Sequence, residues 1–260
     1  MNRDQLKVVG LWFVFLFPLV VLVIYSFAGR WTFPSLIPDT MNFRTLTYFK
    51  ANGTKILTHL GSSFLYSIVA VVLSVCYSLV PAQFLSRADF KGKKLVESLL
   101  LAPAVLPVMT FSVGIHIIFI RLGLADTHFG VALILSVYSY PYMLRALISG
   151  YKTIHPDAFV CARNLGAGFW QILWEIEIPM LLPALSAGAS IVFLVAFSDY
   201  FLVFLIGGGS VPSYSGYLFP FLNSSDWSLA SGLTLLFILL PVLLFVVLDL
   251  TVNRLYRKWM

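Results

Sequence analysis

Few side chains in this chain could do chemistry, and the sharpest candidate is Asp199. It lies in the sequence F-S-D-Y-F-L, between Ser198 and Tyr200, inside a long apolar stretch. A carboxylate in such surroundings is costly and is a functional candidate by default, and the chemistry it offers is binding of a cation. Two structural interpretations stay open: a pair with an arginine of a partner chain, or hydrogen bonds to backbone at a helix break.

His116 is a second polar side chain within an apolar stretch. In such a place a histidine either donates a hydrogen bond between helices or contacts a ligand. The helix-to-helix hydrogen bond is the more common role, and both interpretations are kept.

No arrangement of residues favours an enzyme. Glu175 and Glu177 lie two residues apart on a predicted helix, so they do not share a face. The two cysteines, Cys76 and Cys161, form neither a disulfide framework nor a metal-ligand pattern. The sequence has no G-x-x-x-x-G-K-[ST] phosphate loop, so any ATP must be bound by another chain. We therefore expect no catalytic residue, no metal and no cofactor.

The composition indicates an integral membrane protein. Of 260 residues, 60% are hydrophobic and 11% are charged, whereas a soluble domain carries about 25% charged residues. The net charge of +6 therefore marks loops on the cytoplasmic side of a membrane and does not indicate nucleic-acid binding. We expect one all-α membrane domain over residues 1–260.

Six apolar segments are long enough to cross a bilayer as helices. They cover residues 8–27, 63–85, 95–120, 129–149, 180–206 and 229–250. The second is rich in serine and small residues, which let helices approach closely, and Pro103 and Pro107 should bend the third. Residues 28–62 and 211–227 are then external loops, the first with room for a short surface helix.

Positive charges set the orientation of these spans. If the chain starts inside, twelve Lys and Arg residues are cytoplasmic and five are external. The cytoplasmic ones are Arg3, Lys7, Arg87, Lys91, Lys93, Lys94, Arg145, Lys152, Arg163, Arg254, Arg257 and Lys258, and the external ones are Arg30, Arg44, Lys50, Lys55 and Arg121. Both termini and the segment 150–180 are therefore expected in the cytoplasm.

The segment from Pro156 to Pro179 is neither an apolar span nor a polar loop. Pro156 and Asp157 favour the start of a helix, and Gly166 suits a left-handed C-cap. Gly168 can cap a second helix, which Pro179 should end. Four apolar side chains are expected to be exposed as a docking surface: Phe159, Val160, Leu165 and Phe169.

This segment resembles the EAA loop of the permease subunits of bacterial binding-protein-dependent ABC importers. That loop has Glu-Ala-Ala, three residues, Gly, nine residues and Ile-x-Leu-Pro. With Gly166 as the glycine, residues 160–162 (Val-Cys-Ala) take the Glu-Ala-Ala places and residues 176–179 (Ile-Glu-Ile-Pro) close the pattern. Val160 replaces the glutamate, so the role of that glutamate is not carried over. Residues 90–93 (Phe-Lys-Gly-Lys) also resemble a turn of this family, and the likeness covers about residues 56–250.

The resemblance implies a six-span permease of a type I importer in a bacterial inner membrane, with two permease subunits, two ATPase subunits and an external solute-binding protein. ATP would be bound by the ATPase subunit, and residues 157–169 would form a coupling helix in a cleft of that subunit. The implied coupling residues are Asp157, Phe159, Val160, Ala162, Leu165, Gly166 and Phe169. The external loops around 39–55 and 211–227 are where the binding protein should dock.

The substrate expectation is narrower. The residues around Asp199 resemble the Ser-x-Asp-Asp stretch of polyamine permeases, which implies a cationic solute of the spermidine and putrescine type and a second permease that is a different chain. The implied pathway residues are Asp199, Tyr200, Ser198 and His116.

Two other classes of protein are kept as alternatives. An ATP-independent secondary transporter or channel should show inverted repeats or ion-coupling carboxylates in its spans, and no convincing repeat is found. A scaffold subunit that conducts nothing would have no use for Asp199 or for several prolines within spans.

Overall fold

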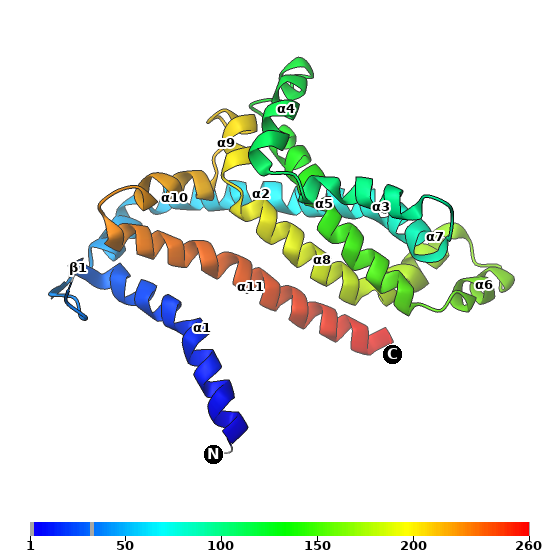
Figure 1. Ribbon diagram of the computed structural model, residues 1–260, viewed down its shortest axis with the longest axis horizontal. Helices are drawn as coiled ribbons and strands as arrows, with labels where there is room; N and C mark the ends of the chain where they lie inside the picture. The colour runs from blue at the N-terminus through cyan, green and yellow to red at the C-terminus, as the bar shows by residue number, and fades with distance from the viewer. Residues whose placement is uncertain (1–2, 32–33, 260) are drawn as a thin grey trace. The chain divides into compact units, whose positions relative to one another are not determined.

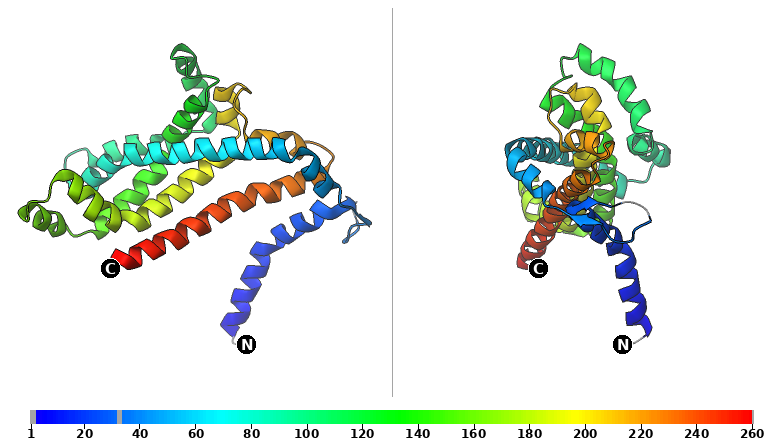
Figure 2. Two further views of the ribbon diagram at one scale, coloured as in Figure 1. Left: turned by 180° about the vertical axis from the view of Figure 1, so that it is seen from behind. Right: turned by 90° about the vertical axis from the view of Figure 1, so that its left-hand side faces the viewer.

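The computed structural model describes residues 3–31 and 34–259, and the side chains of most of them. The chain groups into two compact units, and each is described by itself. Unit 1 contains Met1–Gly61 and Pro212–Leu240, and unit 2 contains Ser62–Val211 and Pro241–Met260. Figure 1 labels the helices and strands, and Figure 2 shows them from two further sides.

Unit 1 joins segments from both ends of the sequence. They are α1 (Arg3–Phe27), the antiparallel strands β1 (Ala28–Arg30) and β2 (Thr40–Met41), α10 (Tyr214–Leu222), and the first parts of α2 (Arg44–Arg87) and α11 (Trp227–Trp259). Hydroxyl groups link its helices: Tyr48 Oη lies 2.7 Å from Tyr217 Oη, and Thr45 Oγ1 lies 3.1 Å from Ser228 Oγ. The segments predicted as external loops therefore contain regular structure, which the apolar windows alone did not indicate.

Unit 2 holds the remaining helices. They are α3 (Lys93–Leu101), a 3-10 turn (Ala102–Ala104), α4 (Val108–Arg121), α5 (His128–Thr153), α6 (Asp157–Asn164), α7 (Phe169–Ile172), a π-helical turn (Leu173–Glu177), α8 (Ile178–Ser198) and α9 (Phe201–Gly207). α4 and α9 pack together at one end of the pair α5 and α8, and α6 and α7 lie at the other end (Figure 1).

α5 and α8 form the largest helix-to-helix contact in the described chain and lie side by side in all views (Figures 1 and 2). Small residues four apart on each helix make this approach possible: Ala146 and Gly150 on α5 face Gly188 and Ala184 on α8. A Cβ at Gly150 would lie only 2.6 Å from the Cβ of Ala184. Such small-residue contacts are typical of helices that pack within a membrane.

The predicted serine-rich packing of the second span is confirmed. Ser74 Oγ of α2 donates a hydrogen bond to the Ser136 carbonyl oxygen of α5 at 3.3 Å, and both serines are buried. Ser78 makes the same contact with the carbonyl of Tyr140 at 3.5 Å. Small hydroxyl side chains thus fill the α2–α5 contact and bond across it.

Among the described residues, four helices are long and apolar enough to cross a membrane. They are Arg44–Arg87, His128–Thr153, Phe169–Ser198 and Trp227–Val252. The segments Lys93–Ala104 and Val108–Arg121 make a fifth if they count as one broken span. They meet at 89°, so the bend predicted at Pro103 and Pro107 is confirmed. The described apolar part of α1, Val14–Phe27, is shorter than these candidate spans.

Two predicted boundaries near α8 are wrong. The sequence predicts that Pro179 ends the second helix of the loop, but the helix runs on from Phe169 to Ser198. Pro179 lies in the first turn of α8, directly after the wider π-helical turn, where a proline is tolerated. The predicted span 180–206 is broken instead at Asp199, because α8 ends at Ser198 and α9 begins at Phe201.

Candidate functional site

Local chemistry sets both ends of α6, as the sequence predicts. Pro156 precedes the helix, and Asp157 lies in its first turn, where a carboxylate suits the positive end of the helix dipole. Gly166 has φ of +85°, the left-handed conformation predicted for it. The N–H of Ala167 donates to the carbonyl of Ala162, and the N–H of Gly166 to that of Arg163, both at 3.0 Å. This is the Schellman pattern, which ends a helix abruptly.

α6 has one buried face and one exposed face. Phe159 and Ala162 are each only 7% exposed, and they belong to the hydrophobic core that also contains residues of α5 and α8. Val160 and Leu165, in contrast, are 54% and 88% exposed. The prediction that Phe159 is exposed is therefore wrong, because its ring packs in the core that α6 shares with α5 and α8. Ala162 cannot offer much surface to a partner either.

The exposed side continues into α7 and the π-helical turn. Phe169, predicted as part of the docking surface, is exposed, and so are Trp170 and Trp174. The rings of Phe169 and Trp170 lie 5.4 Å apart in an edge-to-face arrangement. The two tryptophans were missed by the sequence prediction, although their spacing of four residues was a signal that they share one face of a helix. Together with Val160 and Leu165, these side chains form an exposed apolar surface.

A cluster of interacting side chains lies beneath α6. The Arg87 guanidinium carbon, at the end of α2, lies 4.1 Å from the ring centre of Phe159 and 5.6 Å from that of Tyr151. The Tyr151 hydroxyl donates a hydrogen bond to Glu177 Oε1, and both of these residues are buried. The sequence did not indicate this cluster, because its four members come from four separate elements.

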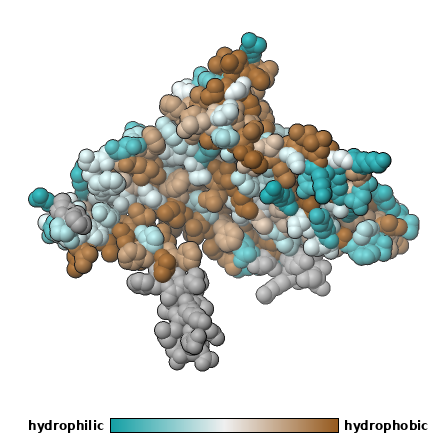
Figure 3. All heavy atoms as spheres, viewed as in Figure 1, coloured by the Kyte–Doolittle hydropathy of each residue, from teal (hydrophilic) through white to brown (hydrophobic). Residues whose placement is uncertain are grey.

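Polar side chains also gather at this end of unit 2. Figure 3 shows hydrophilic side chains gathered over the ends of α3 and α6, and broad apolar surface elsewhere on unit 2 in that view. Gly92 begins α3 with φ of +92°, and residues 91, 93 and 94 beside it are lysines. The positive loop predicted at 87–94 therefore lies at the same end of unit 2 as α6 (Figure 1).

Asp199 lies at the break between α8 and α9. Its Oδ1 accepts a hydrogen bond at 2.7 Å from the N–H of Leu202, in the first turn of α9. Ser198 Oγ donates to the carbonyl of Val195, and the Tyr200 ring stacks on that of Phe204. The backbone-bonding role considered for Asp199 is therefore present, and its role toward a substrate stays a prediction.

His116, the fourth predicted pathway residue, is half-buried on α4, the helix that packs against α9. The structure thus places the predicted pathway residues at the end of α8 (Ser198), in the break before α9 (Asp199 and Tyr200) and on α4 (His116). Ser198, Asp199 and Tyr200 are consecutive in the sequence, whereas His116 comes from α4, the helix that packs against α9.

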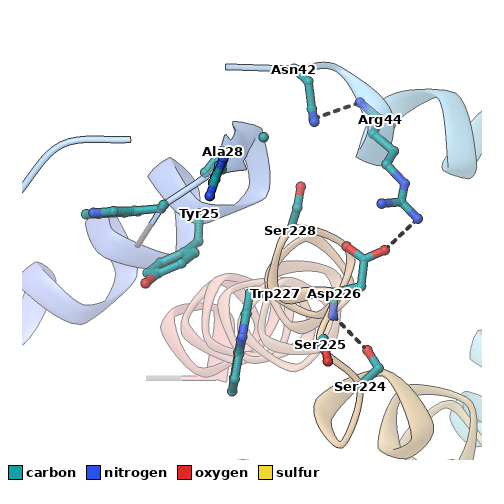
Figure 4. A pocket seen from close by; sticks show the side chains of 12 residues that line it. Tyr25, Ala28, Asn42, Arg44, Ser224, Ser225, Asp226, Trp227 and Ser228 are labelled. Carbon is teal, nitrogen blue, oxygen red and sulfur yellow. Dashed lines mark hydrogen bonds and ion pairs between the residues drawn. The ribbon is translucent and has the colours of Figure 1, made fainter. Parts of the chain in front are cut away.

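Unit 1 contains a pocket of about 590 Å³ at the end of α1 (Figure 4). The rings of Tyr25 and Trp31 stack on one side, with centres 4.3 Å apart. On another side Arg44 pairs with Asp226 at 2.7 Å. The lining also includes Trp227, so the pocket borders both segments predicted to meet a binding protein.

α10 lies in the same unit, outside the candidate spans. Burial, and then the hydrogen bond with Tyr48, raise the pKa of Tyr217, so its phenol is protonated at neutral pH. Lys55 lies over the Tyr217 ring at 5.5 Å, so this ring joins the start of α2 to α10.

No group of three or more His, Cys, Asp or Glu residues in the described part of the chain could hold a metal ion. Cys76 and Cys161 are free thiols and exposed.

Residues 78–260 match the model of the family described as binding-protein-dependent transport system inner membrane component. The match covers more than half of the chain, and the chain belongs to this family. The family is one of transporter permeases in the inner membrane and is not a family of enzymes.

Curated relatives agree with this family. A probable ABC transporter permease protein of Sinorhizobium fredii, y4oR, is 25% identical over 196 residues, which cover 75% of this chain and 70% of that protein. A probable sulfate transport system permease protein of Marchantia polymorpha, cysT, is 26% identical over 58% of this chain and 57% of its own length. The molybdenum transport system permease protein ModB of Escherichia coli is 27% identical over 52% of this chain and 64% of its own length. The matched part thus spans between 57% and 70% of the length of these relatives.

Solved structures show the same fold. A bacterial ABC transporter involved in the import of the acidic polysaccharide alginate superposes with a TM-score of 0.70, covering 96% of this chain and 98% of that chain at 16% identity. The alginate transporter in complex with its alginate pentasaccharide-bound periplasmic protein gives a TM-score of 0.69 at 14% identity. The chain is therefore a permease subunit of the ABC-importer class in sequence family and fold.

Proposed function

We propose that this chain forms part of the translocation pathway of an ATP-driven importer and that α6 docks on a separate ATPase subunit. The observation that carries the proposal is the division of α6, in which Phe159 and Ala162 anchor the helix while Val160 and Leu165 face outward. A helix that is anchored on one side and exposes apolar side chains on the other is suited to transmit a force from a partner. Closure of two ATPase subunits would push two such helices together and open a central cavity to the outside.

The topology belongs to the same proposal. Six spans require α1 to cross the membrane and the bent pair α3–α4 to count as one broken span. With both termini in the cytoplasm, the charge count puts segment 150–180 on the side of the ATPase and the loops around 39–55 and 211–227 on the side of the solute-binding protein. The excess of cytoplasmic Lys and Arg, twelve against five, supports this orientation.

The proposal for the solute rests on the chemistry of Asp199 alone. Asp199, at a helix break next to an apolar span, supports a small cationic solute such as a polyamine. The relatives named above transport sulfate and molybdenum, and the similar solved structure transports alginate, so the fold does not restrict the solute to cations. A second, different permease chain would complete the pathway.

The docking role is tested by placing a charge on the outer face of α6. In Leu165→Asp, the ATPase should no longer co-purify and uptake should be lost, because a carboxylate in an apolar interface must be desolvated without a partner. Leu36→Asp is the matched control, since Leu36 is a 92% exposed leucine in unit 1. If the ATPase still co-purifies with Leu165→Asp and uptake continues, the proposed docking is wrong.

A further inference from the structure

We propose that Arg87, Tyr151 and Glu177 are positioning residues that join α6 to α2, α5 and α8, so that these elements move together when α6 is displaced. The inference rests on the proposed function, because it assigns a path to the force that the ATPase would apply to α6. Arg87 and Tyr151 lie outside the motif that the sequence shares with the permease family, and Glu177 takes the position in it that the pattern leaves unspecified. Each contacts a different element, and the chain of contacts is continuous.

The first step joins α6 to α2 and α5. Arg87 lies over the rings of Phe159 and Tyr151 at 4.1 and 5.6 Å, within the range of a cation–π interaction. The aromatic ring of Phe159 is the single large side chain that α6 buries in the core. A shift of α6 therefore moves the ring that Arg87 covers, and the guanidinium connects that shift to two longer helices.

The second step joins α5 to α8. Glu177 is 6% exposed, and the Tyr151 hydroxyl donates a hydrogen bond to its carboxylate. No ion pair to Glu177 occurs among the described side chains. A buried carboxylate is stable only with hydrogen-bond partners, so the Tyr151 hydroxyl fixes where this part of the helix can lie.

Glu177 and Glu175 point in different directions from the same turn. Both belong to the π-helical turn Leu173–Glu177, and Glu175 is exposed and bonded to Gln171. Residues two apart on a helix do not share a face. The buried carboxylate of Glu177 therefore meets Tyr151 near the end of α5, immediately before α8 begins.

The third step joins α5 and α8 along their length. Gly150 packs against Ala184 and Gly188 against Ala146, so closely that a Cβ on either glycine would crowd its neighbour. A displacement that reaches Tyr151 and Glu177 is therefore carried along both helices, and α8 ends at Asp199. The linkage thus connects the proposed ATPase contact with the proposed solute site.

The test measures whether α6 and α8 move as one body. The protein is purified from native membranes with the subunits that accompany it, in a Cys76→Ser background. Spin labels are placed on Cys161 of α6 and on Met180→Cys at the start of α8, both exposed positions. The distance between the labels is measured without nucleotide and with MgATP and vanadate. We expect the same distance in both states, because the linkage is intact.

The variants Tyr151→Phe and Glu177→Leu remove the donor and the acceptor of the hydrogen bond between α5 and the turn before α8, and Phe159→Leu removes the ring beneath Arg87. In each, the distance between the labels should change on addition of MgATP and vanadate, while the ATPase still co-purifies. Stimulation of ATP hydrolysis by the binding protein should fall by between about twofold and thirtyfold, the usual range for residues within a coupling network. Phe159→Tyr keeps the ring and should behave as the parent.

Glu175→Leu is the matched control, because it removes an exposed carboxylate two residues from Glu177. A label distance that changes in the parent, or that stays constant in Tyr151→Phe and Glu177→Leu, overturns the inference. Loss of the ATPase from these variants also overturns it, since the residues would then shape the docking surface. If no ATPase accompanies the unaltered protein, the proposed function itself is wrong, which is a different result.

Discussion

Gly150 of α5 and Ala184 of α8 face each other so closely that a methyl group on Gly150 would lie 2.6 Å from the Ala184 Cβ. Real Cβ atoms do not approach one another to this distance, so one of the helices would have to move. Gly150 directly precedes Tyr151, whose hydroxyl donates a hydrogen bond to Glu177. A close approach of α5 to α8 therefore lies next to the cluster that supports α6.

The first prediction concerns this contact. Gly150→Ala should lower the stability of the purified protein by about 1–3 kcal/mol, the usual cost of overpacking. The measurement is the thermal unfolding midpoint in detergent. Gly114→Ala is the control, because nothing lies within 4 Å of a Cβ at that position on α4, and alanine should there be neutral or stabilising. Equal midpoints for the two variants would contradict close packing of α5 on α8.

The second prediction concerns the end of α6. Gly166→Ala should destabilise the loop by about 1–2 kcal/mol, because φ of +85° is unfavourable for a residue with a Cβ. Gly168→Ala should have little effect, since its φ is −73° and both positions open into free space. Hydrogen exchange of residues 157–169 measures the difference. Equal exchange rates in the two variants would show that the left-handed cap does not hold α6.

The third prediction separates two roles of Asp199. In Asp199→Asn, the side-chain oxygen can still accept the Leu202 N–H, but the charge is gone. Uptake of a labelled polyamine should therefore fall, while basal ATP hydrolysis is unchanged. In Asp199→Ala the cap is lost as well, which costs a further ~1 kcal/mol of helix stability. Unchanged uptake in the Asn variant together with lost uptake in the Ala variant would assign Asp199 to structure alone.

The fourth prediction concerns orientation. Cys161 is exposed on α6, so a membrane-impermeant maleimide should label it in inverted vesicles and leave it unlabelled in intact cells or spheroplasts. The experiment uses a Cys76→Ser background, so that Cys161 is the one native thiol that the maleimide can label. Leu36→Cys provides the opposite marker, because it lies in unit 1 in a segment predicted to be external. Labelling of Cys161 from outside would reverse the proposed topology.

Local signals predicted much of what local chemistry controls. Pro156, Asp157 and Gly166 marked α6, because helix ends depend on dihedral preference and on the backbone groups next to them. The bend at Pro103 and Pro107 followed from the missing N–H groups. The exposure of Val160 and Leu165 was also predicted, but the same reasoning placed Phe159 outside. A short apolar segment does not reveal which of its side chains a distant helix will cover.

The sequence by itself determined the class of environment and the local turns: an apolar, weakly charged chain forms membrane helices, and the Gly166 cap ends α6. Only the tertiary structure decided that Phe159 is an anchor, that Glu177 is buried while Glu175 is exposed, and that α8 breaks at Asp199. The physical reason is that composition and caps act over a few neighbouring residues. Burial and the contacts of Arg87, Tyr151 and Glu177 depend instead on helices far apart in the chain, whose approach is set by shape at positions such as Gly150 and Ala184.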